Sequence, residues 1–202
     1  LLAVFTPDMP RLWGHTLGQP FIVTSQGLLR MSAIIRPYVP EDARAVLAVN
    51  EASLPAVNSI DTSELDDLAR QSVATLVAVE KDTLLGVLIC LDQTARYDSR
   101  NFAWLKENLG EFLYVDRIAL APEARGRALG QALYGHLIDL FARNSEYAGL
   151  PLACEVNTRP ANPGSLRFHA RLGFREIGTA DHGDKAVVYL ARPLAGTPAQ
   201  GS

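Results

Sequence analysis

The sequence predicts a single α/β domain with a mixed sheet, and three observations support this fold class. The chain has 202 residues, enough for one domain with a substantial core. Apolar residues make up 48% and charged residues 20%, the balance of a globular protein. Apolar runs typical of strands alternate with segments of helical spacing. Their order is strand, two helices, three strands, helix, strand, helix and two strands, without an internal repeat.

One strand and two helices are expected in the amino-terminal part of this domain. Residues 33–39 (AIIRPYV) favour a strand. Residues 40–54 favour a helix, because a proline and two acidic residues suit its first turn and apolar residues recur at helical spacing. A shorter helix is expected at 62–71 (TSELDDLARQ), where Thr62 or Ser63 can cap the first turn.

A hairpin and a long connection occupy the middle of the chain. Residues 73–80 and 83–91 are apolar runs joined by two polar residues, a pattern typical of two strands and a tight turn. Residues 92–110 (DQTARYDSRNFAWLKENLG) are interpreted as a long polar connection that carries three aromatic side chains. Connections of this length are often functional.

Strands and helices alternate in the carboxyl-terminal part. One helix runs to about Arg143, and a second ends at Gly173, a natural helix stop. The predicted strands are 111–120, 152–156, 174–180 and 185–191, and the second helix is 162–172.

Both ends of the chain differ from this domain. Residues 1–30 have three prolines, few charges and no clear period, and they lack the basic start and continuous apolar run of a signal peptide. We expect either that Met31 is the natural start or that residues 1–30 form a loosely ordered arm. Apolar residues of such an arm could pack on a second subunit and form a homodimer. Residues 194–202 are expected to form a flexible tail, which leaves 31–193 as the domain.

Charge and composition exclude several classes of protein. The net charge of −3 argues against a general nucleic-acid binder. There is no run of about 18 apolar residues, so neither a membrane span nor a membrane partner is expected. Cys90 and Cys154 lie in apolar strands and are interpreted as reduced core residues of a cytoplasmic protein. Neither belongs to a metal-ligand pattern, so no metal is expected.

Glycines and arginines lie directly before a helix in residues 123–137 (EARGRALGQALYGHL). The start of a helix has unpaired N–H groups and a positive dipole end, which favour an anionic phosphate. Gly126 and Gly130 let the backbone approach a ligand, and Arg125 and Arg127 add charged donors. A phosphate site and a simple turn with solvated arginines are equally good interpretations of this segment alone.

Two segments resemble signatures of the GCN5-related N-acetyltransferases. Residues 125–130 (RGRALG) resemble the acyl-CoA-binding signature after the fourth strand, which reads Arg or Gln, two residues, Gly, one residue, then Gly or Ala. Residues 155–174 (EVNTRPANPGSLRFHARLGF) resemble the segment of the fifth strand and fourth helix. The resemblance extends from about residue 33 to residue 191. It implies a mixed, mostly antiparallel central sheet of about seven strands, flanked by about four helices.

One position departs from the first signature, because Ala128 replaces its first glycine. Alanine favours the helix if this residue has helical dihedrals. A positive φ would instead strain the loop and weaken cofactor binding. We expect helical dihedrals, since Gly126 and Gly130 remain.

The resemblance also implies acetyl-CoA or coenzyme A as co-substrate, with no metal. The end of the fourth strand would pair with the pantetheine arm, the backbone of 125–130 would hold the pyrophosphate, and the 162–172 helix would lie near the pantetheine and thioester. The cofactor-binding residues so implied are Ile118, Ala119, Leu120, Arg125, Gly126, Arg127, Ala128, Leu129, Gly130, Asn162, Ser165 and Phe168.

Direct attack of an amine on acetyl-CoA is the reaction that the resemblance implies, and it needs a base. Glu155 is the first candidate, because burial in an apolar strand would raise its pKa; the alternative is a position facing solvent. Asp116 is the second candidate, with an ion pair to an arginine as the alternative. His169 occupies a position where the family often has a tyrosine acid. It could donate a proton, bind the cofactor or simply pack, and Tyr134 is another potential donor.

The acceptor pocket is expected beside the 92–110 connection, where Tyr97, Phe102 and Trp104 would line it. These aromatic residues could equally fill a small satellite core. The acceptor itself, a small-molecule or protein amine, depends on the shape of loops and does not follow from the fold.

Three functions compete at this point. The first is an N-acetyltransferase that moves an acetyl group from acetyl-CoA to an amine. The second is a CoA-binding sensor or regulatory module that has the fold without the chemistry. The third is a nucleotide-binding module, against which the missing phosphate-loop lysine weighs.

Overall fold

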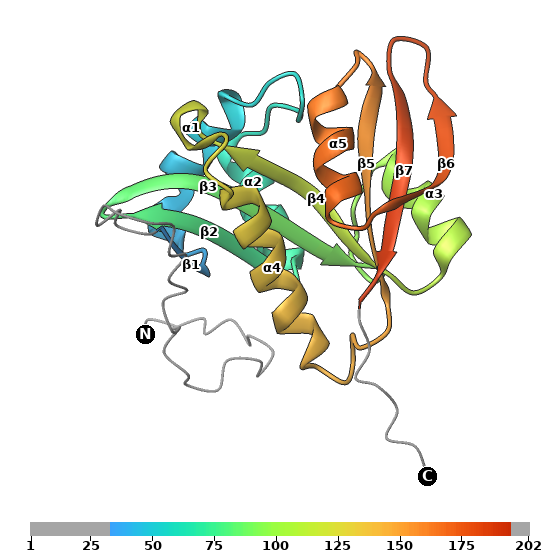
Figure 1. The fold of residues 1–202 in the computed structure, drawn as a ribbon, viewed down its shortest axis with the longest axis horizontal. Helices are drawn as coiled ribbons and strands as arrows, with labels where there is room; N and C mark the ends of the chain where they lie inside the picture. Colours follow the sequence, from blue (N-terminus) through green and yellow to red (C-terminus); the bar gives the residue numbers. More distant parts are fainter. Residues whose placement is uncertain (1–32, 195–202) are drawn as a thin grey trace, which may run out of the picture.

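The computed structural model describes residues 33–194 and contains one open sheet of seven strands (Figure 1). The strands are β1 (Ile34–Pro37), β2 (Ala74–Glu80), β3 (Thr83–Asp92), β4 (Leu113–Leu120), β5 (Pro151–Arg159), β6 (Arg175–Asp181) and β7 (Ala186–Pro193). Their order across the sheet is β1-β2-β3-β4-β5-β7-β6. Only the β4–β5 pair is parallel, so the prediction of a mixed, mostly antiparallel sheet is confirmed.

Five α-helices cover the sheet in the described part of the chain. They are α1 (Ala43–Glu51), α2 (Thr62–Gln71), α3 (Arg100–Leu109), α4 (Leu129–Ala142) and α5 (Pro163–Arg171). Short 3-10 turns precede α1 at Pro40–Asp42 and α4 at Pro122–Ala124. The predicted arm 1–30, the start at Met31 and the predicted tail 194–202, apart from Leu194, lie outside the described residues.

The helices form a layer on each face of the sheet (Figure 1). Helix α4 packs on β2, β3 and β4 through an apolar stripe, and α5 lies beside it on β5. Helices α1 and α3 cover the opposite face, where α1 contacts β3 and β4 and α3 contacts β5. The stripe of α4 includes the fully buried Leu133 and Leu137, which fixes the start of this helix at the sheet.

Strands β4 and β5 separate after a short parallel contact. They pair only at Leu113–Leu152 and Tyr114–Ala153, although both strands continue for several residues. The pairing of β4 with β3 shifts register here, because Asp116 is an extra residue in β4. A bulge of this kind bends and twists a strand. The result is a gap in the sheet that is open to both helical layers.

The 92–110 segment was predicted to be a polar connection, and this is wrong for its second half, which forms α3. Phe102 and Leu105 are buried three residues apart, which is helical spacing. Ser99 caps the helix by accepting a hydrogen bond from the amide of Phe102 (3.4 Å), and Gly110 ends it with a positive φ of 72°. The many polar residues on the exposed face obscured this pattern in the sequence.

The cap of α2 and the bounds of α1 also differ from the prediction. Asp61, rather than Thr62 or Ser63, caps α2, and it forms a reciprocal capping box with Glu64. The predicted 40–54 helix is shorter, because its first three residues form a 3-10 turn and the α-helix ends at Glu51.

Helix α3 is held on the sheet by an aromatic stack. The rings of Trp104 and Tyr189 lie 3.9 Å apart at an interplanar angle of 4°. Gly178 on β6 leaves the space for the indole, because a Cβ at this position would lie 2.5 Å from the Trp104 ring.

Gly178→Ala should therefore push the indole off its stack and lower the unfolding free energy by about 1–3 kcal/mol. Gly135→Ala is the matched control, since nothing lies within 4 Å of a Cβ there and alanine favours the helix. Urea unfolding of both variants tests this. Equal stability of the two variants would show that the Trp104 stack does not constrain α3.

Candidate active site

A cavity of about 750 Å³ occupies the gap between β4 and β5 and is lined by residues from both helical layers. The structure thus brings together predicted residues that are as far apart in the sequence as Tyr97 and His169. The predicted site residues on its wall are Tyr97, Asp116, Ile118, Ala119, Leu120, Arg125, Gly126, Gly130, Glu155, Asn162, Ser165, Phe168 and His169.

Five predicted site residues do not line this cavity. Arg127 points away and forms an ion pair with Glu80 (2.6 Å), and the exposed Ala128 and the buried Leu129 contribute only backbone to the loop. Phe102 is buried against Phe112 and Tyr114. Trp104 stacks on Tyr189. Two of the three aromatic residues predicted for the acceptor pocket are thus packing residues, and Tyr97 alone reaches the cavity.

The loop before α4 forms one end of the cavity. Gly126 has a φ of +75°, and a Cβ on Gly130 would meet the Phe168 ring at 3.1 Å, so both positions favour glycine. The amides of Arg125 and Arg127 donate to carbonyl groups within the loop at 3.3 Å. The first amides of α4 remain as donors for an anion, because no preceding helical turn can accept from them.

The backbone conformation of Ala128 differs from the prediction. It lies in the left-handed region, with φ 61° and ψ 11°, as the N-cap of α4, and not in the predicted helical conformation. Its carbonyl already accepts from the amide of Ala132 (3.0 Å). The helix thus begins directly after Ala128, at Leu129, and the two glycines did not remove the need for a positive φ at Ala128.

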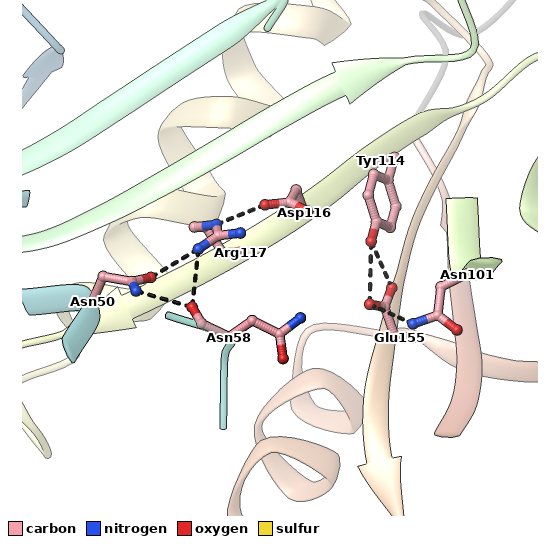
Figure 2. Close-up of polar contacts among 7 residues, drawn as sticks. All are labelled: Asn50, Asn58, Asn101, Tyr114, Asp116, Arg117 and Glu155. Atoms are coloured by element: carbon pink, nitrogen blue, oxygen red, sulfur yellow. Dashed lines mark hydrogen bonds and ion pairs between the residues drawn. The ribbon is translucent and has the colours of Figure 1, made fainter. Parts of the chain in front are cut away.

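Glu155 lies on the cavity wall, and its carboxylate faces Asn101 of α3 and Tyr114 of β4 (Figure 2). The hydroxyl of Tyr114 donates to both of its carboxylate oxygens (2.9 and 3.1 Å), and the amide of Asn101 donates to one of them (3.0 Å). Burial and then the negative charge of Asp116 raise its pKa from 4.5 to about 7, although these two hydrogen bonds lower it. A carboxyl group with this pKa can accept a proton near neutral pH.

Asp116 is paired with its neighbour Arg117 (Figure 2). The guanidinium Nε lies 2.6 Å from the Asp116 carboxylate, and both side chains are about 95% buried. Arg117 also donates to Asn50 (2.9 Å). The ion pair that the sequence offered as an alternative is therefore present. The Asp116 carboxylate is thus already occupied by Arg117, and its negative charge contributes to the raised pKa of Glu155.

His169 and Tyr134 form a buried pair on the α4–α5 side. Nδ1 of His169 lies 2.9 Å from the carbonyl oxygen of Ser165, which can only accept, so Nδ1 carries the hydrogen. Nε2 must then accept from the hydroxyl of Tyr134 (2.9 Å). Burial lowers the pKa of His169, which keeps its ring neutral near pH 7. These contacts do not favour the predicted role of His169 as a proton donor.

Asn162 has a structural role at the start of α5. Its side-chain oxygen accepts from the amide of Ser165 (3.1 Å) and caps the helix. The side-chain NH₂ group is not used in this bond, and both residues lie on the cavity wall.

The sequence did not reveal Asn101, Tyr114 or Arg117 as site residues. Asn101 lies in the segment interpreted as a connection, so its position beside Glu155 depends on the unpredicted helix α3. Tyr114 and Arg117 appeared as ordinary members of a strand. The bulge at Asp116 lets both face the α1–α3 layer, and no feature of the sequence indicated that bulge.

No group of three or more His, Cys, Asp or Glu side chains within residues 33–194 is placed to hold a metal ion. No helix in this range is both long and apolar enough to cross a membrane.

The cavity between the two separated strands thus has the start of α4 and the half-buried carboxylate of Glu155 on its wall. Residues 44–174 match the acetyltransferase (GNAT) family, and the chain belongs to this family. The resemblance found in the sequence is confirmed.

Solved structures with the same fold include Ard1 from Thermoplasma volcanium, with a TM-score of 0.63 and 17% identity over 80% of this chain and 97% of that one. Another is yncA from Salmonella typhimurium, determined with its cofactor acetyl-CoA, with a TM-score of 0.60 and 19% identity over 84% of this chain and 98% of that one. A curated relative is phosphinothricin N-acetyltransferase from Streptomyces coelicolor, 40% identical over 65 residues. The match spans 31% of this chain and about a third (33%) of that relative.

The strain at Ala128 can be tested by substitution. Ala128→Gly should raise the unfolding free energy by about 1 kcal/mol, because glycine adopts a positive φ without the cost that alanine has. Ala132→Gly, one turn into α4, should instead lower it by about 1 kcal/mol. Thermal unfolding of the two variants gives the sign of each change. A loss of stability in Ala128→Gly would contradict the left-handed geometry.

The hydrogen bonds to Glu155 predict in which direction its pKa changes when a donor is removed. Tyr114→Phe removes a donor that stabilises the charged carboxylate, so the pKa of Glu155 should rise by about one unit. The pH dependence of the carboxyl ¹³C signal measures this without an activity assay. Tyr147→Phe is the control, because Tyr147 packs on Phe141 away from the cavity. A pKa that is unchanged or lower in Tyr114→Phe would show that the bond is not formed.

Proposed function

We propose that this protein is an N-acetyltransferase that moves an acetyl group from acetyl-CoA to an amine of a small molecule or protein. The observation that carries the proposal is the position of Glu155. Its pKa is near 7, and it lies on the cavity wall opposite the loop suited to a phosphate. Membership of the acetyltransferase family, and the activity in the name of the Streptomyces relative, support the same reaction.

Two parts of the cavity wall suit coenzyme A, namely the first turn of α4 and the edge of β4. The amides of the first turn of α4 would bind the pyrophosphate, and the glycines at 126 and 130 keep this end open. Beyond Tyr114, the side of β4 that faces β5 has no ladder partner, so its backbone can pair with the amide groups of the pantetheine arm. The acetyl thioester would supply the activated acyl group.

The reacting amine would approach from the α1–α3 layer, on the side of Glu155. Such an amine is mostly protonated at neutral pH and must lose a proton before or during attack. Glu155 would accept that proton, directly or through water, and the amide of Asn101 and hydroxyl of Tyr114 would hold its carboxylate in place. Asp116 remains the second candidate base, after Glu155, because its carboxylate is already paired with Arg117.

Glu155→Gln tests the proposal, with Glu176→Gln on the exposed face of β6 as the matched control. Thiol release from acetyl-CoA with a panel of amines should fall at least about 10²-fold in kcat/KM for Glu155→Gln. In the unchanged protein, kcat/KM should rise with pH through about 7, where Glu155 loses its proton, and this rise should be absent in the variant. The dissociation constant of CoA, measured by calorimetry, should be similar in all three proteins.

Three outcomes would contradict all or part of the proposal. Unchanged turnover in Glu155→Gln would remove Glu155 as the base. Binding of CoA without thiol release from any amine would favour the sensor function, and a failure to bind CoA would reject both functions.

A further inference from the structure

The side chains of Glu155, Asn101 and Tyr189 form a triangle beside the cavity. Glu155 on β5 pairs directly with Tyr189 on β7, so both side chains lie on the same face of the sheet. Helix α3 contacts β5, and Asn101 in its first turn bonds to both residues. Its Nδ2 donates to Glu155 (3.0 Å), and its Oδ1 accepts from the hydroxyl of Tyr189 (3.0 Å). In Figure 2 the nitrogen of this amide points toward Glu155 and its oxygen points to the other side.

The hydroxyl of Tyr189 favours one of the two orientations of the Asn101 amide. A reversed amide would point its oxygen at the Glu155 carboxylate, where two acceptors would repel each other. It would also point its NH₂ group at Tyr189, which is fully buried and whose hydrogen would lose its acceptor. A buried donor without an acceptor costs free energy. The observed orientation is therefore the stable one while Glu155 is charged.

Protonation of Glu155 changes this balance, because a neutral carboxyl group can donate to the oxygen of Asn101. The reversed amide would then stabilise the neutral form, which cannot accept a proton from an amine. Tyr189 opposes the reversal in both protonation states, since its hydroxyl donates to the same oxygen. Without that hydroxyl, the longer contact with His182 (3.4 Å) is what remains for this oxygen among the described residues.

The ring of Tyr189 keeps the hydroxyl in place. It stacks on Trp104, which follows Asn101 by three residues and therefore lies on the same side of α3. A phenylalanine at position 189 would keep this stack, so the hydroxyl can be removed while the packing of α3 is retained.

We propose that Tyr189 is a positioning residue for acetyl transfer, because its hydroxyl holds the amide of Asn101 with the NH₂ group toward Glu155. This proposal rests on the function proposed above, in which Glu155 accepts the proton of the amine. Tyr189 is fully buried, so it acts on Glu155 through Asn101 and not by contact with a substrate.

Other groups around this triangle are the same whether or not Tyr189 has its hydroxyl. Those on the cavity wall that can carry charge are Asp116, Arg117, His182 and Lys185. Those whose pKa burial raises, so that they stay neutral, are Tyr97, Tyr114, Tyr134 and Cys154. A difference between the protein and a variant at position 189 therefore reports on the hydroxyl.

Tyr189→Phe should raise the pKa of Glu155 by about 0.5, because the charged carboxylate loses part of its hydrogen bonding. The pH dependence of the Glu155 carboxyl ¹³C signal measures this without turnover. With acetyl-CoA and one amine, kcat/KM should fall about threefold at pH 6 and be unchanged at pH 9, where Glu155 is charged in both proteins. Tyr147→Phe, which lies away from the cavity, should change neither quantity.

Asn101→Ala tests whether Tyr189 acts through the amide. In this background Tyr189→Phe should leave the pKa of Glu155 as it is. A further rise there, or no rise in the single variant, would overturn the proposal. An equal fall in kcat/KM at both pH values would also overturn it, because a purely structural loss lowers activity without displacing the pH profile.

Failure of the proposed function gives a different result. If the unchanged protein releases no thiol with any amine, the acetyltransferase function fails, and the role of Tyr189 in that reaction fails with it. The carboxyl titration would still show whether Tyr189 orients Asn101, because it needs neither acetyl-CoA nor an amine.

Discussion

The separation of β4 from β5 is the constraint on which the rest of the site depends. The two strands pair at only two positions before the extra residue Asp116 twists β4 away. The gap joins the two helical layers, so a ligand from the α4–α5 side can meet one from the α1–α3 side. Without this gap, the helix start at Gly130 and the carboxylate of Glu155 would lie on opposite faces of a closed sheet.

Opposing effects act on the pKa of Glu155, and those that raise it prevail. Burial and the charge of Asp116 favour its neutral form, whereas the hydroxyl of Tyr114 and the amide of Asn101 favour its charged form. Arg117 neutralises Asp116 and so limits how far that charge can act. A carboxyl group with fewer donors would stay protonated, and one with a free cation beside it would be too weak a base. The five side chains therefore act as one unit, and their positions depend on α3 and on the bulge in β4.

The sequence predicted the sheet, its strands and the start of the helix after the glycine-containing loop because these features are local. Apolar residues alternate or run together over the few residues of a strand, and the signals of a helix start lie within a few neighbouring residues. It failed for α3, whose two buried residues are hidden among polar ones, and for Ala128, where only the backbone of the folded loop shows the positive φ. Asn101 and Arg117 could not be identified, because their partners are 54 and 67 residues away in the chain.

The two ends of the cavity are also connected through one segment, the connection between α1 and α2. Arg125, in the loop before α4, donates to the carbonyl of Ala52 (3.1 Å), and six residues later Asn58 accepts from both Arg117 and Lys185. The loop before α4, strand β4 and the turn between β6 and β7 thus all bond to one short segment. Because this segment also forms part of the cavity wall, a shift of its backbone would change both ends of the cavity together.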